Sequence, residues 1–113
     1  MYHSMPAAAL QTEVFRTLAD PTRRGLFERL AREGELTVSA LTAKAKVSQP
    51  AVSQHLAALK QAGLVKDRKE GRTTHYSCAP EGLKPLANWV EHYSKFWLEK
   101  LDELEAFLNR MDQ

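Results

Sequence analysis

The sequence predicts a mainly α-helical domain that carries one small β-hairpin. Apolar residues recur at helical spacing through most of the chain, two short strand-like runs flank a glycine in its second half, and the last third has the pattern of one long amphipathic helix. A chain of 113 residues, 43% of them hydrophobic, has the size of one domain with a modest core. We therefore predict a single domain over residues 1–113, with residues 1–6 disordered.

Two helices are predicted at the start of the chain. In the first, over residues 7–18, Leu10 and Val14 belong to one apolar face. Asp20 then stands where a helix cap is expected, and Pro21 follows at the first helical position, where a missing N–H costs nothing. A second helix is therefore expected to begin at Pro21.

The helix predicted from Ser48 to Gly63 has two different faces. Ser48 is a good N-cap, and Gly63 supplies the left-handed residue that ends a helix. One face is apolar at positions i, i+4 and i+7, namely Val52, Leu56 and Leu59. The opposite face carries short amides, hydroxyls and small residues, namely Pro50, Ser53, Gln54, Ala57 and Gln61. Such side chains suit close approach to base edges in a major groove, although a charge-poor surface helix has the same pattern.

A shorter helix precedes this one. Residues 37–45 have a helical pattern capped by Thr37, and only Lys46 and Val47 separate them from Ser48. Two helices joined by so tight a turn form a helix-turn-helix, which we place at residues 37–63.

A hairpin is predicted directly after it. Residues 64–69 and 73–78 are strand-like and surround Glu70-Gly71, where the glycine suits a turn. Alternation directs Val65, Tyr76 and Cys78 to the core, and Lys66, Arg68, Thr73 and His75 away from it. Helix, turn, helix and hairpin in this order predict a winged helix-turn-helix, with the wing at residues 64–79.

The positive charge is concentrated over the same part of the chain. Residues 44–75 carry seven basic and two acidic side chains, net +5, whereas residues 81–113 are net −3 and the whole chain is only +2. An ordinary solvated surface can also be basic. Its coincidence with the helix-turn-helix and the hairpin favours contacts with nucleic-acid phosphates.

The region from about Phe15 to Ala79 resembles the ArsR/SmtB family of bacterial winged-helix repressors. The resemblance is carried by residues 18–24 (LADPTRR), 48–56 (SQPAVSQHL), Leu59, 63–65 (GLV), and Gly71-Arg72 leading to Tyr76. It implies a homodimer that binds a palindromic operator in double-stranded DNA, with the second helix of the motif in the major groove. By position, the family's base-facing residues correspond to Gln49, Pro50, Ser53 and Gln54.

The full set of residues expected to contact DNA combines this helix with the wing. Arg72, at the wing tip, is the best candidate for a phosphate or minor-groove contact. His55 lies near the apolar face, where a packed histidine is commoner than a metal ligand, and a phosphate contact is also open. The set is Ser48, Gln49, Pro50, Ser53, Gln54, His55, Lys60, Arg68, Lys69 and Arg72.

A long C-terminal helix is predicted within residues 80–111, with Pro85 obscuring its start. Val90, Trp97, Leu104 and Met111 recur every seven residues, which is a near-heptad row. This row favours a dimer interface, although a lid over the same chain or an aromatic ligand pocket is an alternative. The expected interface consists of Leu10, Val14, Val90, Tyr93, Trp97, Leu101, Leu104 and Leu108.

Metal sensing is where the sequence departs from the best-known members of the family it resembles. They have a Cys-x-Cys pair where this chain has Thr37 and Ser39, and hydroxyls are poor ligands for zinc or softer metals. A second family site, on the last helix, needs histidines, and only His92 lies there beside Glu91. We predict no metal and no cofactor, so the chain looks closer to metal-independent, SdpR-like members, with an unknown small-molecule effector possible.

Several function classes are excluded by the residue patterns. We find no catalytic spacing of Ser, His and Asp, no Gly-rich phosphate loop and no paired carboxylates in an apolar setting, so no enzyme is expected. No secretory signal or membrane span is visible, and one cysteine fits a reducing cytoplasm. Cys78 is interpreted as a small hydrophobe rather than a redox sensor. A ligand- or metal-responsive repressor and a winged-helix protein-interaction module remain the alternative functions.

Overall fold

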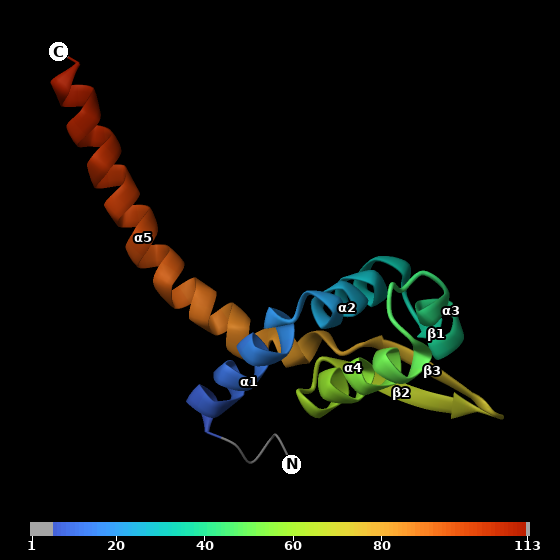
Figure 1. Ribbon diagram of the computed structural model, residues 1–113. Helices are drawn as coiled ribbons and strands as arrows, with labels where there is room; N and C mark the ends of the chain where they lie inside the picture. The colour runs from blue at the N-terminus through green and yellow to red at the C-terminus, as the bar shows by residue number, and fades with distance from the viewer. Residues whose placement is uncertain (1–5, 113) are drawn as a thin grey trace.

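The computed structural model describes residues 6–112, and the disorder predicted for residues 1–6 therefore falls, apart from Pro6, outside the described residues. The elements in chain order are α1 (Ala7–Ala19), α2 (Pro21–Glu33), β1 (Leu36–Thr37), α3 (Val38–Ala43), α4 (Gln49–Gln61), β2 (Val65–Glu70), β3 (Thr73–Cys78), the 3-10 helix η2 (Pro80–Leu83) and α5 (Lys84–Met111) (Figure 1). This order confirms the predicted fold class, a mainly helical winged helix-turn-helix.

Side-chain caps begin three of the helices at the predicted residues. The Asp20 carboxylate accepts the backbone N–H of Arg23 at 2.9 Å and starts α2. The hydroxyl oxygens of Thr37 and Ser48 accept the N–H groups three residues later, at 3.1 and 3.3 Å, and start α3 and α4. These bonds form within four consecutive residues, which is why the sequence alone predicts them.

The end of α4 is equally local. Gly63 has a φ of 80°, in the left-handed region that favours glycine. The N–H of Gly63 donates to the carbonyl of Lys60 at 3.0 Å, and the N–H of Leu64 donates to the carbonyl of Leu59 at 2.9 Å. This pair of bonds is a Schellman motif, which ends the helix at the predicted Gly63 and turns the chain directly into β2.

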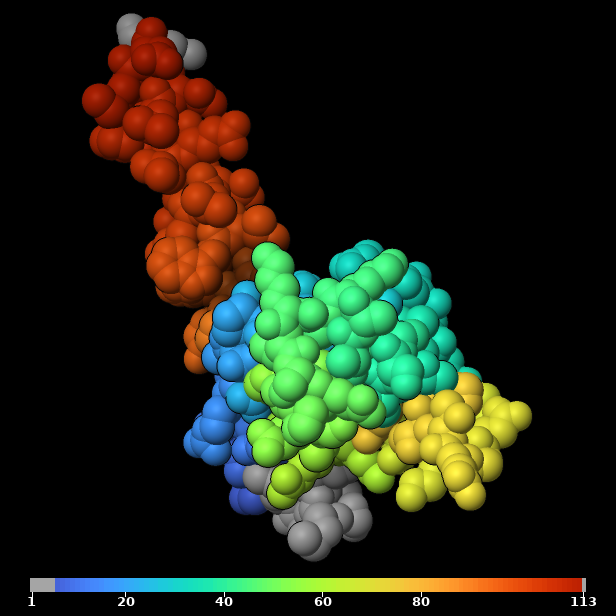
Figure 2. Space-filling view, turned by 45° about the vertical axis from the view of Figure 1, so that its right-hand side comes forward, coloured from blue at the N-terminus to red at the C-terminus, as the bar shows by residue number. Residues whose placement is uncertain are grey.

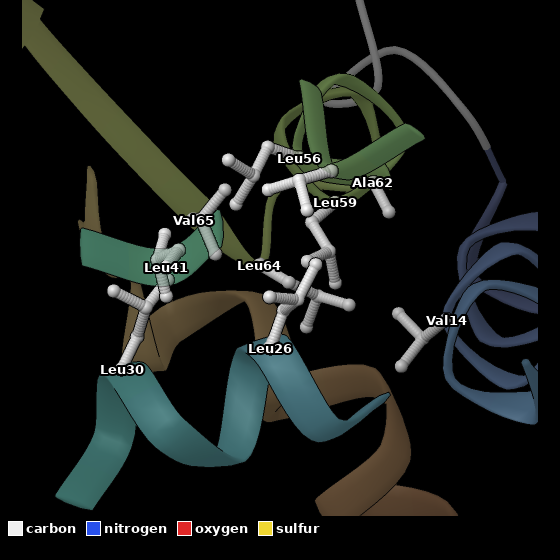
Figure 3. Packing of buried hydrophobic residues seen from close by; sticks show 10 residues of the cluster. Val14, Leu26, Leu30, Leu41, Leu56, Leu59, Ala62, Leu64 and Val65 are labelled. Atoms are coloured by element: carbon white, nitrogen blue, oxygen red, sulfur yellow. The ribbon is translucent and has the colours of Figure 1, made fainter. Parts of the chain in front are cut away.

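One hydrophobic core joins α1, α2, α3, α4 and the start of β2 (Figure 3). Its buried members are Val14, Leu26, Leu30, Leu41, Val52, Leu56, Leu59, Ala62, Leu64 and Val65. Val14 requires a correction to the predicted dimer interface. Its side chain is 2% exposed and points into the core of its own chain, so it has no surface to offer a partner. An apolar position on an amphipathic helix can face either a core or a partner, and periodicity does not distinguish them.

The wing is a three-stranded sheet rather than a hairpin alone. The antiparallel strands lie in the order β1-β3-β2, with Leu36 opposite Tyr76 and Val65 opposite Cys78. Strand β1 was not predicted, because two residues are too few to show the period of two that marks a strand. The predicted inward face is confirmed, since Val65 is buried and Tyr76 and Cys78 pack against the core.

Helix α5 starts against the body of the molecule and then leaves it. Trp89 meets Phe15 of α1 edge-to-face, with ring centroids 5.2 Å apart. Beyond this contact the helix projects into solvent and accounts for the 69 Å long axis of the molecule (Figures 1 and 2). It therefore does not fold back as a lid over its own chain. Within residues 6–112, no helix is both long and apolar enough to span a membrane.

Candidate nucleic-acid interface

Helix α4 presents its polar face to solvent. Val52, Leu56 and Leu59 are fully buried on one side of the helix, at 0% exposure. On the opposite side Ser53 and Gln54 are exposed. Ser48, Gln49 and Pro50, at the N-terminal end of the helix, are exposed as well. The buried side thus holds the helix in the core while the uncharged polar side remains accessible to a major groove.

An arginine that the sequence did not single out holds α3 in place beside α2. The guanidinium of Arg29 donates to the carbonyls of Ala40 and Leu41 at 3.2 and 3.3 Å, and to the Glu33 carboxylate at 2.8 Å. These two carbonyls belong to the last turn of α3, where helical partners are missing. Because Arg29 and Leu41 are 12 residues apart, no local sequence pattern identifies this contact.

Two cations expected to contact DNA, one in the wing and one in α4, are paired with carboxylates. The Arg68 guanidinium contacts Glu35 at 2.7 Å and Glu70 at 2.9 Å, and these hydrogen bonds raise the pKa of Arg68 and lower that of Glu35. Lys60 of α4 contacts Asp67 at 2.9 Å, which raises the lysine pKa. Both cations were expected to contact phosphates. In the structure, carboxylates offset both charges. Glu35, directly before β1, lies beside Arg68, and Asp67 of β2 lies beside Lys60.

His55 also turns toward the protein. It is half-buried, and its Nδ1 lies 4.0 Å from the Asp20 carboxylate at the start of α2. The pKa of Asp20 is lowered chiefly by the N–H of Arg23, with a smaller contribution from His55. The packed histidine weighed for this position therefore describes the structure better than a phosphate contact.

Two cations at the tip of the wing remain accessible. Lys69 and Arg72 are exposed, and neither forms an ion pair with any other residue of the described part of the chain. They flank the turn at Gly71, which has a φ of 62° and so favours glycine. Figure 2 shows the wing (yellow) beside the helix-turn-helix (green and teal), away from the projecting end of α5. The candidate site thus combines the exposed, uncharged face of α4 with two accessible cations at the wing tip.

This arrangement matches that of known transcription regulators. Residues 18–68 match the model of a helix-turn-helix domain family. The arsenical resistance operon repressor of Escherichia coli is 44% identical over 103 residues, which span 91% of this chain and 88% of that protein. The chain belongs to the ArsR family of transcriptional regulators.

Other relatives agree with this family assignment. The arsenic resistance transcriptional regulator ArsR1 of Pseudomonas putida is 44% identical over 78 residues, 69% of this chain and 58% of that protein. A solved ArsR-like transcriptional regulator from Rhodococcus sp. RHA1 superposes with a TM-score of 0.70 at 30% identity, covering 88% of this chain and 93% of that one. The chain is thus a DNA-binding regulator of the ArsR family and not an enzyme.

The regulator exposes a long apolar row on α5. Val90, Tyr93, Trp97, Leu101, Leu104 and Leu108 are 46, 43, 59, 56, 51 and 50% exposed. Leu10 of α1 is half-buried. A contiguous apolar surface of this length is unusual on a monomer and marks an interaction surface.

Candidate metal and redox residues of the regulator do not come together. Within residues 6–112, no three His, Cys, Asp or Glu side chains are placed to hold a metal ion. Thr37 is occupied as the cap of α3. The Cys78 thiol donates to the carbonyl of Phe27 at 3.6 Å, and burial raises its pKa, which disfavours the reactive thiolate.

Proposed function

We propose that this regulator is a homodimeric repressor that reads a palindromic operator and does not sense metals, as in SdpR-like members. The observation that carries the proposal is the exposed, uncharged face of α4 at Ser53 and Gln54, which points away from the three fully buried residues of the helix. This geometry lets the helix enter a major groove without desolvating charge, and amides there can pair with base edges. The repressor role is supported by the name of the Escherichia coli relative.

The palindrome follows from the proposed dimer. Two copies joined through α5 are related by a two-fold axis, so their two α4 helices meet two inverted half-sites. The exposed row from Val90 to Leu108 supplies the surface for that pairing. We infer that residues 1–113 form one such domain and that it works in the cytoplasm, where a single free thiol stays reduced.

The direct test is selection of bound sites from random DNA by the purified regulator. We expect an inverted repeat to emerge, bound at least about a thousandfold more tightly than bulk DNA at the same salt concentration. A winged helix that serves as a protein-interaction module selects no motif, and that result would overturn the proposal.

Gln54→Ala and Arg72→Ala should weaken DNA binding in different ways. Gln54→Ala should cost about 1–3 kcal/mol on the operator and much less on random DNA, because a lost base contact affects discrimination. Arg72→Ala should weaken both DNAs similarly and lower the log–log salt slope by about two for a symmetric dimer, because it removes one phosphate contact per protomer. The measurement is affinity for both DNAs at several salt concentrations.

A matched control for Arg72→Ala is available on the same strand pair. Arg68→Ala removes an equal charge, but the Arg68 guanidinium is bonded to Glu35 and Glu70 and is not free to contact a phosphate, so the loss of salt slope should be clearly smaller. Equal losses on both DNAs for Gln54→Ala, or an unchanged salt slope for Arg72→Ala, would show that α4 and the wing do not lie on DNA in this way.

Metals should leave operator binding unchanged. Stoichiometric zinc, cadmium or nickel, and likewise a chelator, should not alter the affinity, because Thr37 and Ser39 offer only hydroxyls. Gel shift or fluorescence anisotropy with and without each ion measures this directly. Release of DNA by any one of these ions would identify the chain as a metal-responsive repressor.

A further inference from the structure

A polar pocket of about 280 Å³ lies between α3, α4 and β3. Five hydroxyl groups line it, those of Thr37, Ser39, Ser53, Thr73 and Thr74. The amide of Gln49 and the guanidinium of Arg72 complete its polar lining, and no carboxylate takes part. We call this set of residues the hydroxyl pocket.

Several hydroxyl groups of the lining are free to donate a hydrogen bond to a ligand. The Thr37 oxygen accepts the Ala40 N–H, which leaves its proton free to donate. The hydroxyls of Ser39, Ser53 and Thr74 form no hydrogen bond with other side chains or backbone of the described chain. Ser39 and Ser53 are exposed and Thr74 is half-buried, so these groups are accessible from outside.

This chemistry suits a phosphate. Hydroxyls and a guanidinium can all donate to its oxygens, which only accept, and the Arg72 charge complements the single negative charge of a diester. A cation would be repelled by Arg72 and would find no carboxylate among the lining residues. The neutral hydroxyls add hydrogen bonds without adding charge, so a singly charged ligand is matched better than a dianion.

We propose that the hydroxyl pocket holds one phosphate of the DNA backbone in each half-site. The proposal rests on the proposed function and extends it. The pocket lies between Gln49 and Ser53 of α4 and Arg72 of the wing. A DNA strand that runs from the major groove occupied by α4 to the wing would therefore pass over the pocket. A phosphate that is hydrogen-bonded by residues of α3, α4 and β3 together would fix the position of α4 along the base pairs.

The test combines protein variants with neutralised phosphates in the operator. Each backbone phosphate of one half-site is replaced in turn by an uncharged methylphosphonate, and affinity is measured for the wild type and for the Ser39→Ala/Thr74→Val double variant. For the wild type, we expect one position at which neutralisation weakens binding roughly tenfold. In the double variant, the loss at that position should shrink while the losses elsewhere are unchanged.

The two substitutions are chosen to preserve folding. Alanine favours helix more than serine does, and valine keeps the β-branched shape of Thr74 in a strand. The double variant alone should bind operator and random DNA about tenfold or more weakly, with an unchanged salt slope, since no charge is removed. The matched control is Thr12→Val on α1, whose hydroxyl bonds to the Ala8 carbonyl outside the pocket. It should bind both DNAs as the wild type does.

The outcomes separate this proposal from the proposed function. A wild type without preference for any operator defeats the proposed function itself. Specific wild-type binding together with losses in the double variant that show no coupling to any one phosphate overturns the hydroxyl pocket alone. A second arm titrates inorganic phosphate into the DNA-free protein by calorimetry. Tight, saturable binding that Ser39→Ala/Thr74→Val abolishes would assign the pocket to a free anion instead of the DNA backbone.

Discussion

Leu101→Glu should convert the proposed dimer into a folded monomer and weaken operator binding at least about a thousandfold, equivalent to roughly 4 kcal/mol. Leu101 is 56% exposed in the single chain, so its replacement leaves the core of the chain intact. In a dimer, the new carboxylate would be buried in an apolar seam without a partner, which costs several kcal/mol. Analytical ultracentrifugation measures the mass, and circular dichroism verifies that the helices remain.

Two further variants test whether this result is specific to the apolar row on α5. Trp97→Ala should weaken the dimer by about 3–5 kcal/mol if the ring is buried on association. Lys95→Glu adds the same side chain to α5 at an exposed position off the apolar row, and the dimer should persist. A wild type that is already a monomer, or a Leu101→Glu variant that stays dimeric, would show that the apolar row on α5 is not the dimer interface.

Gly82→Ala should destabilise the fold by about 3 kcal/mol, the upper part of the range for overpacking a tight site. A Cβ at Gly82 in η2 would overlap the carbonyl oxygen of Gly63 and lie 2.7 Å from its carbonyl carbon. Both atoms are backbone, so the chain itself must shift. Since Gly63 ends α4 and η2 leads into α5, the shift also disturbs the angle between α4 and α5. Chemical denaturation gives the free energy of unfolding.

A glycine-to-alanine substitution at Gly25 should have the opposite effect and raise the free energy of unfolding. A Cβ there meets no atom within 4 Å, and the residue lies inside α2. Alanine in a helix interior is more favourable than glycine by roughly 0.5–1 kcal/mol, so Gly25→Ala should raise the stability. If Gly82→Ala is as stable as the wild type, the close approach of η2 to the end of α4 does not exist in solution.

Helix α4 shows how far sequence reasoning can reach. Its start at Ser48, its end at Gly63 and its two faces were all predicted, and the structure confirms each one. The caps depend on hydrogen bonds between residues no more than five apart, and the faces depend on a period of 3.6. The fold class and the family resemblance rest on the same kind of local information.

The electrostatics of the wing were decided by tertiary structure. The sequence gives no reason to distinguish Arg68 and Lys60 from Lys69 and Arg72. In the structure, however, only Arg68 and Lys60 of these four are paired with carboxylates. One of the two partners of Arg68, Glu35, is 33 residues away and is placed beside it by the pairing of β1, a strand too short to predict. Charge along a chain is additive, but whether a charge is free depends on which distant side chain lies beside it.

By itself the sequence determined the caps that start α2, α3 and α4, the end of α4 at Gly63, the apolar and polar faces of α4, and the family resemblance, because caps, turns and periodic faces are encoded within a few neighbouring residues. Only the tertiary structure decided that Val14 serves the core rather than a partner, that Arg29 clamps α3, and that hydroxyls from three elements share one pocket. The physical reason is the same in each case. These contacts join side chains whose separation along the chain carries no periodic signal, so they are established only when the elements pack.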